Sequence, residues 1–154
     1  MIIIGIDPGL TGAIAVLHDG RLTEIYDMPT APRGSRNAVI PAALTDILRQ
    51  WDDGLAFVEM VHSMPGQGVS SAFNFGHGCG VIEGVLAALR IPSTLVTPQK
   101  WKKAMSVSAD KGQARGRAMQ LFPASSSRFA RVKDDGRAEA ALIALYGYQT
   151  MTKA

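Results

Sequence analysis

Residues 2–12 read Ile2-Ile-Ile-Gly-Ile-Asp7-Pro-Gly-Leu-Thr-Gly12, and this stretch decides the fold. The almost unbroken apolar run that ends at Asp7 predicts a central β-strand covered on both faces. Pro8-Gly9 then turns the chain. A carboxylate at the end of a buried strand is costly unless it is paired, hydrogen-bonded or bound to a cation. Asp7 is therefore the first candidate for a functional residue.

Two further strands follow directly, at residues 12–17 and 21–28. They are joined by His18-Asp19-Gly20, and Asp-Gly between apolar runs is a strong signal for a β-hairpin. Periodicity and Gly/Pro-rich breaks then predict a loop at 29–36, a helix at 38–50, a strand at 55–59, a loop at 62–68, a helix at 69–90, a strand at 93–97, helices at 98–105 and 108–122, a loop at 123–133 and a last helix at 134–148.

This order of elements predicts an α/β fold. The three-strand meander and the two later strands are expected to form a five-stranded mixed sheet with helices on both faces. The 154 residues suit a single domain spanning residues 1–154. No apolar run is long enough for a membrane span, and the first residues lack the pattern of a signal peptide, so a cytoplasmic protein is expected.

Positive charge is concentrated in one part of the chain. Residues 98–137 contain ten Lys and Arg but three Asp, a net charge of +7 against −4 for the remainder. Such a segment indicates a polyanionic partner, although a solvated basic face without a partner explains the charge equally well. Cys79 is the single cysteine, which excludes an intrachain disulfide and a cysteine zinc cluster.

A second carboxylate occupies the same kind of position as Asp7. Glu59 ends the apolar strand 55–59, and neighbouring strands lie about 4.8 Å apart. If the two strands pair, their carboxylates face each other, and like charges so close resist joint ionisation unless a divalent cation is bound. For Asp7 alone, a turn carboxylate that caps the amides of Gly9 or Leu10 is the alternative.

The last helix supplies two more acidic residues. Asp135 and Glu139 are four positions apart and therefore lie on one helical face. With Asp7 and Glu59 they would form an oxygen-rich cluster of the kind that Mg²⁺ or Mn²⁺ prefers. Two such ions about 3.5–4 Å apart activate a water and stabilise the leaving oxygen of a phosphodiester. Asp134 fits the helix N-cap better, and a solvated helix start is the alternative for the whole motif.

Short sequence motifs carry a resemblance to a known family: Gly5-Ile-Asp7-Pro-Gly-Leu-Thr-Gly12, Phe57-Val-Glu59, Asp134-Asp135-Gly-Arg-Ala-Glu139-Ala, and the stretches 64–76 and 96–103. Across nearly its full length the chain resembles the Holliday junction resolvases of the RuvC type, and the last two stretches resemble the variants found in bacteriophages and prophages. The resemblance implies a ribonuclease-H-like fold, a homodimer and Mg²⁺-dependent nicking of paired strands at a four-way DNA junction.

By position, the metal-binding acids of this family fall on Asp7, Glu59, Asp135 and Glu139. The family often spaces the last two acids three apart and ends with Asp, whereas here the gap is four and the last acid is Glu. A helix accepts either spacing on one face. The resemblance thus implies a catalytic site in which these four acids hold two Mg²⁺ ions, with Mn²⁺ as a substitute.

The family commonly has a bulky aromatic residue three positions after the second acid, where it wedges at the junction, and this chain lacks it. The position is His62, which could stack on a base or have no role. Phe73 and Phe75 could replace the wedge, although their spacing on a helix fits the core better. Because paired nicks need two active sites, a homodimer is expected, and the glycine-rich helix 69–90 is the candidate interface.

Basic residues around the last strand fit DNA binding. Lys102 and Lys111 match basic positions of the family near the scissile phosphate and the junction arms. Trp101 either stacks on DNA or packs in the core. Contacts to phosphates would strengthen binding without reading bases. The resemblance extends these contacts to Lys100, Lys103, Arg115 and Arg117.

Other functions stay open beside a junction-resolving endonuclease. A nickase of the same fold could cut flaps, forks or other branched DNA. A non-catalytic junction-binding module would be expected to have an incomplete acidic set, whereas all four acids are present. Sugar kinases and chaperone ATPases also begin with an Asp-Gly strand turn, but they need two large lobes.

Overall fold

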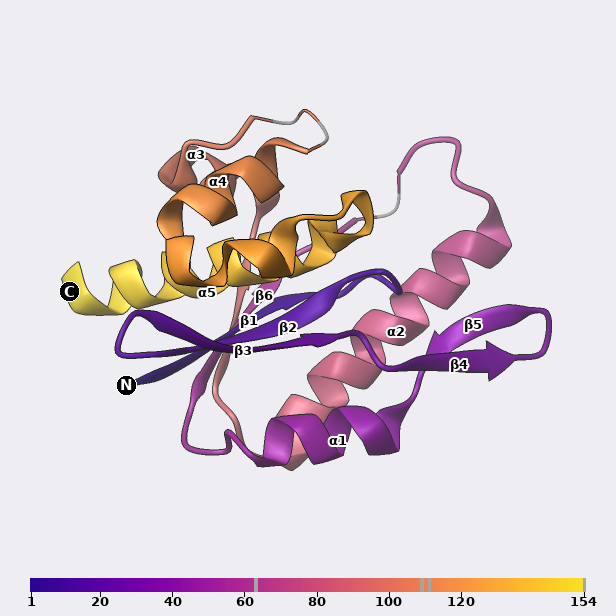
Figure 1. Cartoon of the computed structure of the whole chain (residues 1–154). Helices are drawn as coiled ribbons and strands as arrows, with labels where there is room; N and C mark the ends of the chain where they lie inside the picture. The colour runs from indigo at the N-terminus through magenta and orange to yellow at the C-terminus, as the bar shows by residue number, and fades with distance from the viewer. Residues whose placement is uncertain (63, 109, 111, 154) are drawn as a thin grey trace.

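The centre of the molecule is a five-stranded sheet made of β1 (Ile2–Asp7), β2 (Ala13–His18), β3 (Arg21–Asp27), β6 (Leu55–Glu59) and β7 (Ser93–Val96). The computed structural model describes residues 1–62, 64–108, 110 and 112–153. The strand order is β3-β2-β1-β6-β7, so β1 is central (Figure 1). β1, β2 and β3 form an antiparallel meander, and β6 and β7 run parallel to β1. The predicted mixed sheet is confirmed.

Helices cover both faces of this sheet, as predicted, and their bounds are α1 Pro41–Arg49, α2 Val69–Ala88, α3 Pro98–Met105, α4 Gln113–Leu121 and α5 Asp135–Lys153. α1 and α2 lie on one face, and α3, α4 and α5 lie on the other (Figure 1). Successive side chains of β1 enter opposite layers, since Ile3 belongs to the core under α5 and Ile4 to the core under α1 and α2. Among the described residues, no helix is both long and apolar enough to cross a membrane.

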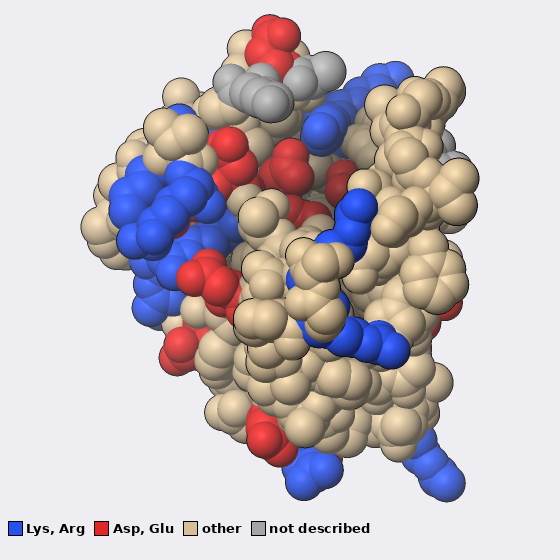
Figure 2. Space-filling model, turned by 90° about the vertical axis from the view of Figure 1, so that its right-hand side faces the viewer, with Lys and Arg blue, Asp and Glu red and all other residues tan. Residues whose placement is uncertain are grey.

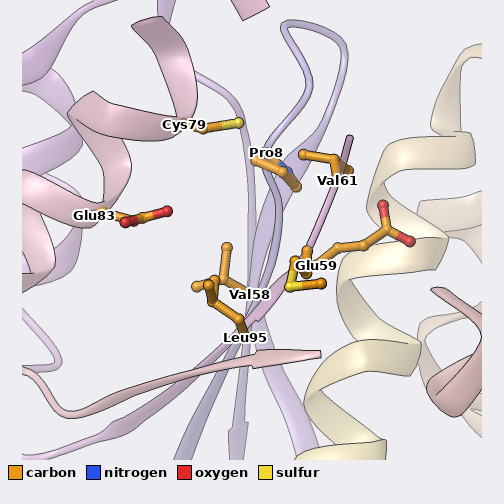
Figure 3. A pocket seen from close by; sticks show the side chains of 8 residues that line it. Pro8, Val58, Glu59, Val61, Cys79, Glu83 and Leu95 are labelled. Carbon is orange, nitrogen blue, oxygen red and sulfur yellow. The ribbon is translucent and has the colours of Figure 1, made fainter. Parts of the chain in front are cut away.

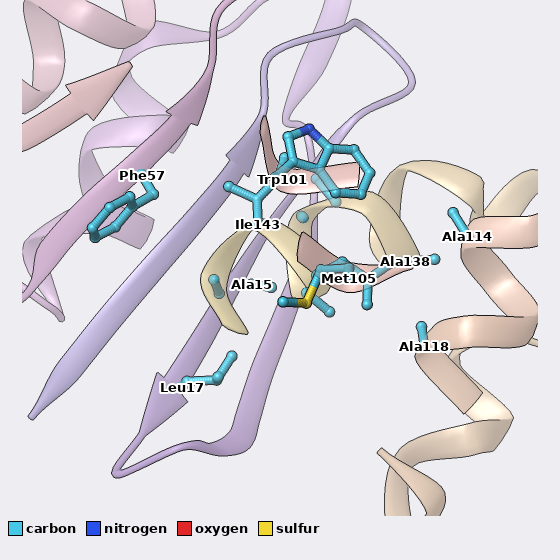
Figure 4. Close-up of a cluster of buried hydrophobic side chains, with 14 of the residues drawn as sticks. Ala15, Leu17, Phe57, Trp101, Met105, Ala114, Ala118, Ala138 and Ile143 are labelled. Carbon is cyan, nitrogen blue, oxygen red and sulfur yellow. The ribbon is translucent and has the colours of Figure 1, made fainter. Parts of the chain in front are cut away.

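Small residues allow α5 to lie close to the sheet. A Cβ at Gly5 of β1 would overlap the backbone oxygen of Ala140 and would lie 2.8 Å from the Cβ of Ala144. Gly136 in the first turn of α5 packs in the same way against the backbone of Thr11. Figure 4 shows the core on this face, where side chains of β2, α3, α4 and α5 meet. α5 therefore lies directly against the strand that ends in Asp7.

The predicted loop at 29–36 is wrong, because this segment forms most of a β-hairpin. β4 (Thr30–Arg33) and β5 (Arg36–Val39) pair antiparallel as a separate two-stranded sheet. Gly34 between them has a φ of 64°, a left-handed conformation that glycine adopts without strain. The helix expected from residue 38 begins only at Pro41, because residues up to Val39 belong to strand β5.

The C-terminal half also differs from the prediction at the ends of its elements. The helix predicted at 108–122 begins at Gln113, because Gly112 has a φ of 86°, which a right-handed helix does not contain. The predicted loop at 123–133 contains two short 3-10 helices, Pro123–Phe129 and Val132–Asp134, and α5 continues beyond residue 148 to Lys153.

The contact between α5 and β1 can be tested with Gly5→Ala. The new methyl group would overlap the backbone of α5, so the helix must move and the free energy of unfolding should fall by about 1–3 kcal/mol. Gly116→Ala on α4 is the matched control, since a Cβ there meets nothing within 4 Å and should stabilise the helix by up to about 1 kcal/mol. Urea denaturation measures both; equal stability of wild type and Gly5→Ala would contradict the contact.

Candidate active site

Three carboxylates from three elements meet at one end of the sheet. Asp7 ends β1 and Glu59 ends β6, and these strands are parallel neighbours whose preceding residues, Ile6 and Val58, are paired. Glu139 comes from the second turn of α5. One oxygen from each of the three carboxylates lies within 4.8 Å of the others. The expected pairing of the two strands is confirmed, and it brings Asp7 and Glu59 together.

Glu59 reaches this cluster from a buried position. The residue is 8% exposed. Its backbone borders a cavity of about 60 Å³ between β6 and α2, which Cys79 and Glu83 also line. Figure 3 shows that the Glu59 carboxylate points away from these two residues, toward α5. The carboxylate of Glu59 therefore lies on the same side of the sheet as Glu139.

Burial and mutual repulsion make this cluster unfavourable for negative charge. The pKa of Asp7 is raised from 3.8 to about 7. Burial is the largest cause of this rise in pKa, the negative charges of Glu139 and Glu59 add to it, and a 3.2 Å hydrogen bond from the Gly9 backbone N–H opposes it. The turn-capping contact considered for Asp7 is thus present together with the cluster. Burial, followed by the charge of Glu59, raises the pKa of Glu139, and Lys102 opposes this shift. A cluster of hard oxygen donors that resists joint ionisation fits Mg²⁺ or Mn²⁺.

Trp101 packs in the core, and it also holds one of the acids. It is fully buried, so stacking on DNA is excluded in this structure. Its indole Nε1–H donates a 2.9 Å hydrogen bond to Oε1 of Glu59 (Figure 4 shows the ring). The next residue, Lys102, lies 3.7 Å from the Glu139 carboxylate and 5.3 Å from the centre of the Trp101 ring. α3 therefore orients two of the three acids, a role of Trp101 that the sequence pattern did not reveal.

Asp135 and Asp134 have different surroundings. Asp135 is 43% exposed and accepts a 2.9 Å hydrogen bond from Arg115, and it is not one of the three acids in mutual reach. Asp134 is almost completely buried, and hydrogen bonds from Arg131 hold its pKa below the usual range. Asp134 thus belongs to the capping box of the 3-10 helix Val132–Asp134, where its carboxylate accepts a hydrogen bond from the backbone N–H of Arg131, and not to the N-cap of α5 that was predicted for it.

A hollow of about 480 Å³ opens over the carboxylates. We call it the acidic hollow; Asp7, Thr11, Lys102, Asp135 and Glu139 are among its lining residues. Figure 2 shows acidic side chains within a depression and Lys and Arg side chains around it. Asp135 shares this hollow with Asp7 and Glu139, although its side chain is turned to Arg115.

The remaining predicted DNA-binding residues are distributed unevenly. Lys100 and Lys103 are exposed on α3. Arg117 donates a 2.7 Å hydrogen bond to the backbone oxygen of Met105, so its guanidinium is partly occupied within the protein. Lys111 lies outside the described residues.

The candidate wedge residues all lie near the start of α2. His62 is exposed and lines an apolar hollow that Met64 and Phe75 also line. Phe73 is 75% exposed, so its predicted place in the core is wrong, and Phe75 is half-buried. Helical spacing alone could not reveal this, because it does not say which face of the helix meets the sheet.

Comparison with known proteins supports the fold. No protein-family model and no curated protein matches the sequence. Among solved structures, RuvC of Thermus thermophilus in complex with a Holliday junction substrate matches with a TM-score of 0.75 and 20% identity, over 99% of this chain and 96% of that one. The chain has a RuvC-like fold. A second structure of Thermus thermophilus RuvC matches with a TM-score of 0.62 and 16% identity, over 99% and 97% of the two chains.

The RuvC-like fold confirms the expected ribonuclease-H-like architecture. At 20% identity the likeness concerns the fold, so a function has to be argued from the residues of this chain. The resemblance to phage and prophage variants stays a prediction.

The raised pKa of Asp7 predicts how stability depends on pH. Without metal, the folded protein binds the Asp7 proton more tightly than the unfolded chain, so this contribution to stability is present below about pH 4 and is lost as the pH rises through about 7. Asp7→Asn should therefore raise the Tm at pH 8 by at least about 2–4 °C, which is the change in Tm that corresponds to about 1 kcal/mol of unfolding free energy. At pH 4 the substitution should change the Tm little.

Thermal denaturation in EDTA at the two pH values measures this difference. Asp53→Asn in an exposed turn is the control and should leave the pH dependence unchanged. Addition of Mg²⁺ at pH 8 should stabilise the wild type and not Asp7→Asn, because a ligand stabilises the state that binds it. An Asp7→Asn protein with the pH dependence and the Mg²⁺ response of the wild type would contradict the assigned cluster.

Proposed function

We propose that the chain is a metal-dependent endodeoxyribonuclease that resolves four-way DNA junctions by paired nicks, with residues 1–154 acting as one nuclease domain. The observation that carries this proposal is the meeting of Asp7, Glu59 and Glu139 below a basic rim. The RuvC-like fold supports the choice of DNA, since the Thermus thermophilus protein with this fold is known in complex with a Holliday junction substrate.

Asp7, Glu59 and Glu139 would hold divalent cations, Mg²⁺ or Mn²⁺. When bound, two such ions supply an activated water and stabilise the leaving oxygen of a phosphodiester. Asp7 is the central ligand of this proposal, because it ends the middle strand and is close to both other acids. Asp135 is the fourth proposed ligand; it lines the same hollow and would have to exchange its hydrogen bond with Arg115.

Lys102 has two roles in this proposal. It lies at the edge of the cluster, 3.7 Å from Glu139, where it offsets part of the negative charge and can contact a phosphate that enters the hollow. The other proposed phosphate contacts carry positive charge around the same opening and fix the DNA backbone without reading its sequence. They are Lys100, Lys103, Lys111, Arg115 and Arg117, with His62 at the base-stacking position.

A labelled four-way junction tests the function. In Mg²⁺ the wild type should cut it at paired positions, and Asp7→Asn should lower the rate by more than about 100-fold, because the loss of groups that merely support metal ligands already costs 10–100-fold. Asp53→Asn is the control and should cut like the wild type.

Flap, fork and linear duplex DNA complete this experiment. Equal cutting of flaps and junctions would favour the broader branched-DNA nickase, and equal cutting of linear duplex would contradict structure specificity. Junction binding without cutting would favour the non-catalytic module. Undiminished cutting by Asp7→Asn would contradict the mechanism.

A homodimer through α2 belongs to the same proposal. One side of α2 presents exposed apolar and small residues, with Val69 88% and Phe73 75% exposed. On this side a Cβ at Gly76, Gly80 or Gly84 would meet nothing within 4 Å, so a second backbone could approach closely. Large apolar side chains exposed side by side are typical of interaction surfaces.

Gly80→Glu tests this interface, because it places a charge in the middle of the exposed face of α2. The wild type should be a dimer at micromolar concentration by light scattering, and Gly80→Glu should shift it to monomer. Gly116→Glu on exposed α4 is the matched control and should remain dimeric. A monomeric wild type would contradict the homodimer, and a dimeric Gly80→Glu would contradict α2 as its interface.

A further inference from the structure

A second groove lies next to the acidic hollow, on the side of α2. It has a volume of about 320 Å³ and lies between the turn after β1, the β4–β5 hairpin and the start of α2. Thr11 lines both this groove and the acidic hollow, so the two are adjacent. Arg36 of the hairpin lines it together with Ser71, Asn74 and Phe75 of α2. We call it the hairpin groove.

We propose that the hairpin groove, with Arg33 and Arg36, binds the phosphate backbone of the DNA strand as it leaves the acidic hollow. This inference rests on the proposed function and assigns a DNA contact to a part of the chain outside the basic segment 98–137. The hairpin itself was not predicted from the sequence, so neither arginine was among the expected DNA contacts.

The charge of this region has one sign. Residues 28–45 and 60–82, which contain the hairpin and the start of α2, include Arg33 and Arg36 but no Asp or Glu. Arg33 is hydrogen-bonded to a histidine, His77, at 2.9 Å, and Arg36 donates to the hydroxyl of a serine at 3.0 Å. Neither arginine has a carboxylate partner in the part of the chain that the structure describes.

Three arginines of the basic segment 98–137 differ in this respect. Arg115, Arg131 and Arg137 each form an ion pair with an aspartate, and this reduces the charge that they offer to DNA. A guanidinium has five N–H donors, so one hydrogen bond to a neutral partner leaves the others for a phosphate. Arg33 and Arg36 are exposed and are therefore better placed to attract a polyanion.

The hairpin is held in place against α2, so its arginines need little reorganisation on binding. Asn74 of α2 donates a 3.1 Å hydrogen bond to the backbone oxygen of Asn37 in β5, and Arg36 reaches Ser71 on the same helix. Figure 1 shows the hairpin extending outward beside α2, past the end of the sheet. A groove walled by a fixed cation and a half-buried aromatic ring, Phe75, combines the groups that bind a nucleic-acid strand independently of sequence.

Electrostatics explains why a contact on this side is needed. The acids that line the hollow repel phosphates on both sides of the phosphate being cut. Basic residues of α3 and α4 can offset this repulsion on one side only, because they lie on the opposite face of the sheet from the hairpin and α2. Uncompensated charge on the hairpin supplies the attraction on the other side.

The double variant Arg33→Gln/Arg36→Gln tests the proposal. Binding of a labelled four-way junction is measured in EDTA, where metal-dependent cutting cannot occur, over a series of salt concentrations. Loss of two phosphate contacts in each protomer should reduce the magnitude of the slope of log K against log salt by about 1.4–1.8 for each protomer that contacts the junction, and affinity at low salt should fall by about 10-fold or more. Arg49→Gln, an exposed arginine at the end of α1, is the matched control and should keep the wild-type slope.

The pair Arg33→Lys/Arg36→Lys separates charge from local structure. It should return the slope toward the wild-type value, whereas a lysine pair that binds as weakly as the glutamine pair would overturn the proposal. A glutamine pair with the wild-type slope would overturn it as well, and cutting of junctions by the wild type in Mg²⁺ would then leave the proposed function standing. A wild type that neither binds nor cuts branched DNA would contradict both the proposed function and the DNA contact in the hairpin groove.

Discussion

α5 can lie directly on β1 because Gly5 faces Ala140 and Ala144, and these small residues let the two backbones approach. This contact sets the position of the helix over the sheet, and its second turn therefore carries Glu139 to the end of β1. Glu59 arrives independently, through the parallel pairing of β6 with β1. The candidate site thus depends on one tight contact between a helix and a sheet, because the strand pairing alone would bring two acids together without the third.

Bringing the three carboxylates together lowers the stability of the fold. Burial and mutual repulsion raise the pKa of both Asp7 and Glu139, so full ionisation without a cation is unfavourable. α3 offsets part of this cost, since Trp101 donates a hydrogen bond to Glu59 and the adjacent lysine lies near Glu139. In the proposed function a divalent cation would offset this repulsion, and its binding would therefore stabilise the whole domain. The proposed binding of DNA requires positive charge outside the site, and basic residues lie both on α3 and on the hairpin.

Much of this could be predicted from the sequence. The mixed sheet could be predicted because a strand that is covered on both faces is almost entirely apolar. The pairing of Asp7 with Glu59 was expected because each of these acids ends such an apolar run. Glu139 followed from helical spacing. Asp135 was expected at the same point, but its carboxylate is turned to Arg115, and a partner twenty positions away in the chain cannot be seen in a local pattern. Phe73 was wrongly placed in the core for a related reason, since spacing does not say which side of α2 faces the sheet.

The sequence by itself therefore determined the five strands of the central sheet and the acids that end β1 and β6, because these properties depend on neighbouring residues. Only the tertiary structure decided which acids come within reach of one another and that Trp101 donates a hydrogen bond to Glu59. It also decided that the segment around Gly34 forms a hairpin, whose two arginines have no carboxylate partner among the described residues. These features depend on contacts between residues far apart in the chain, and such contacts are set by how closely helices and strands can pack.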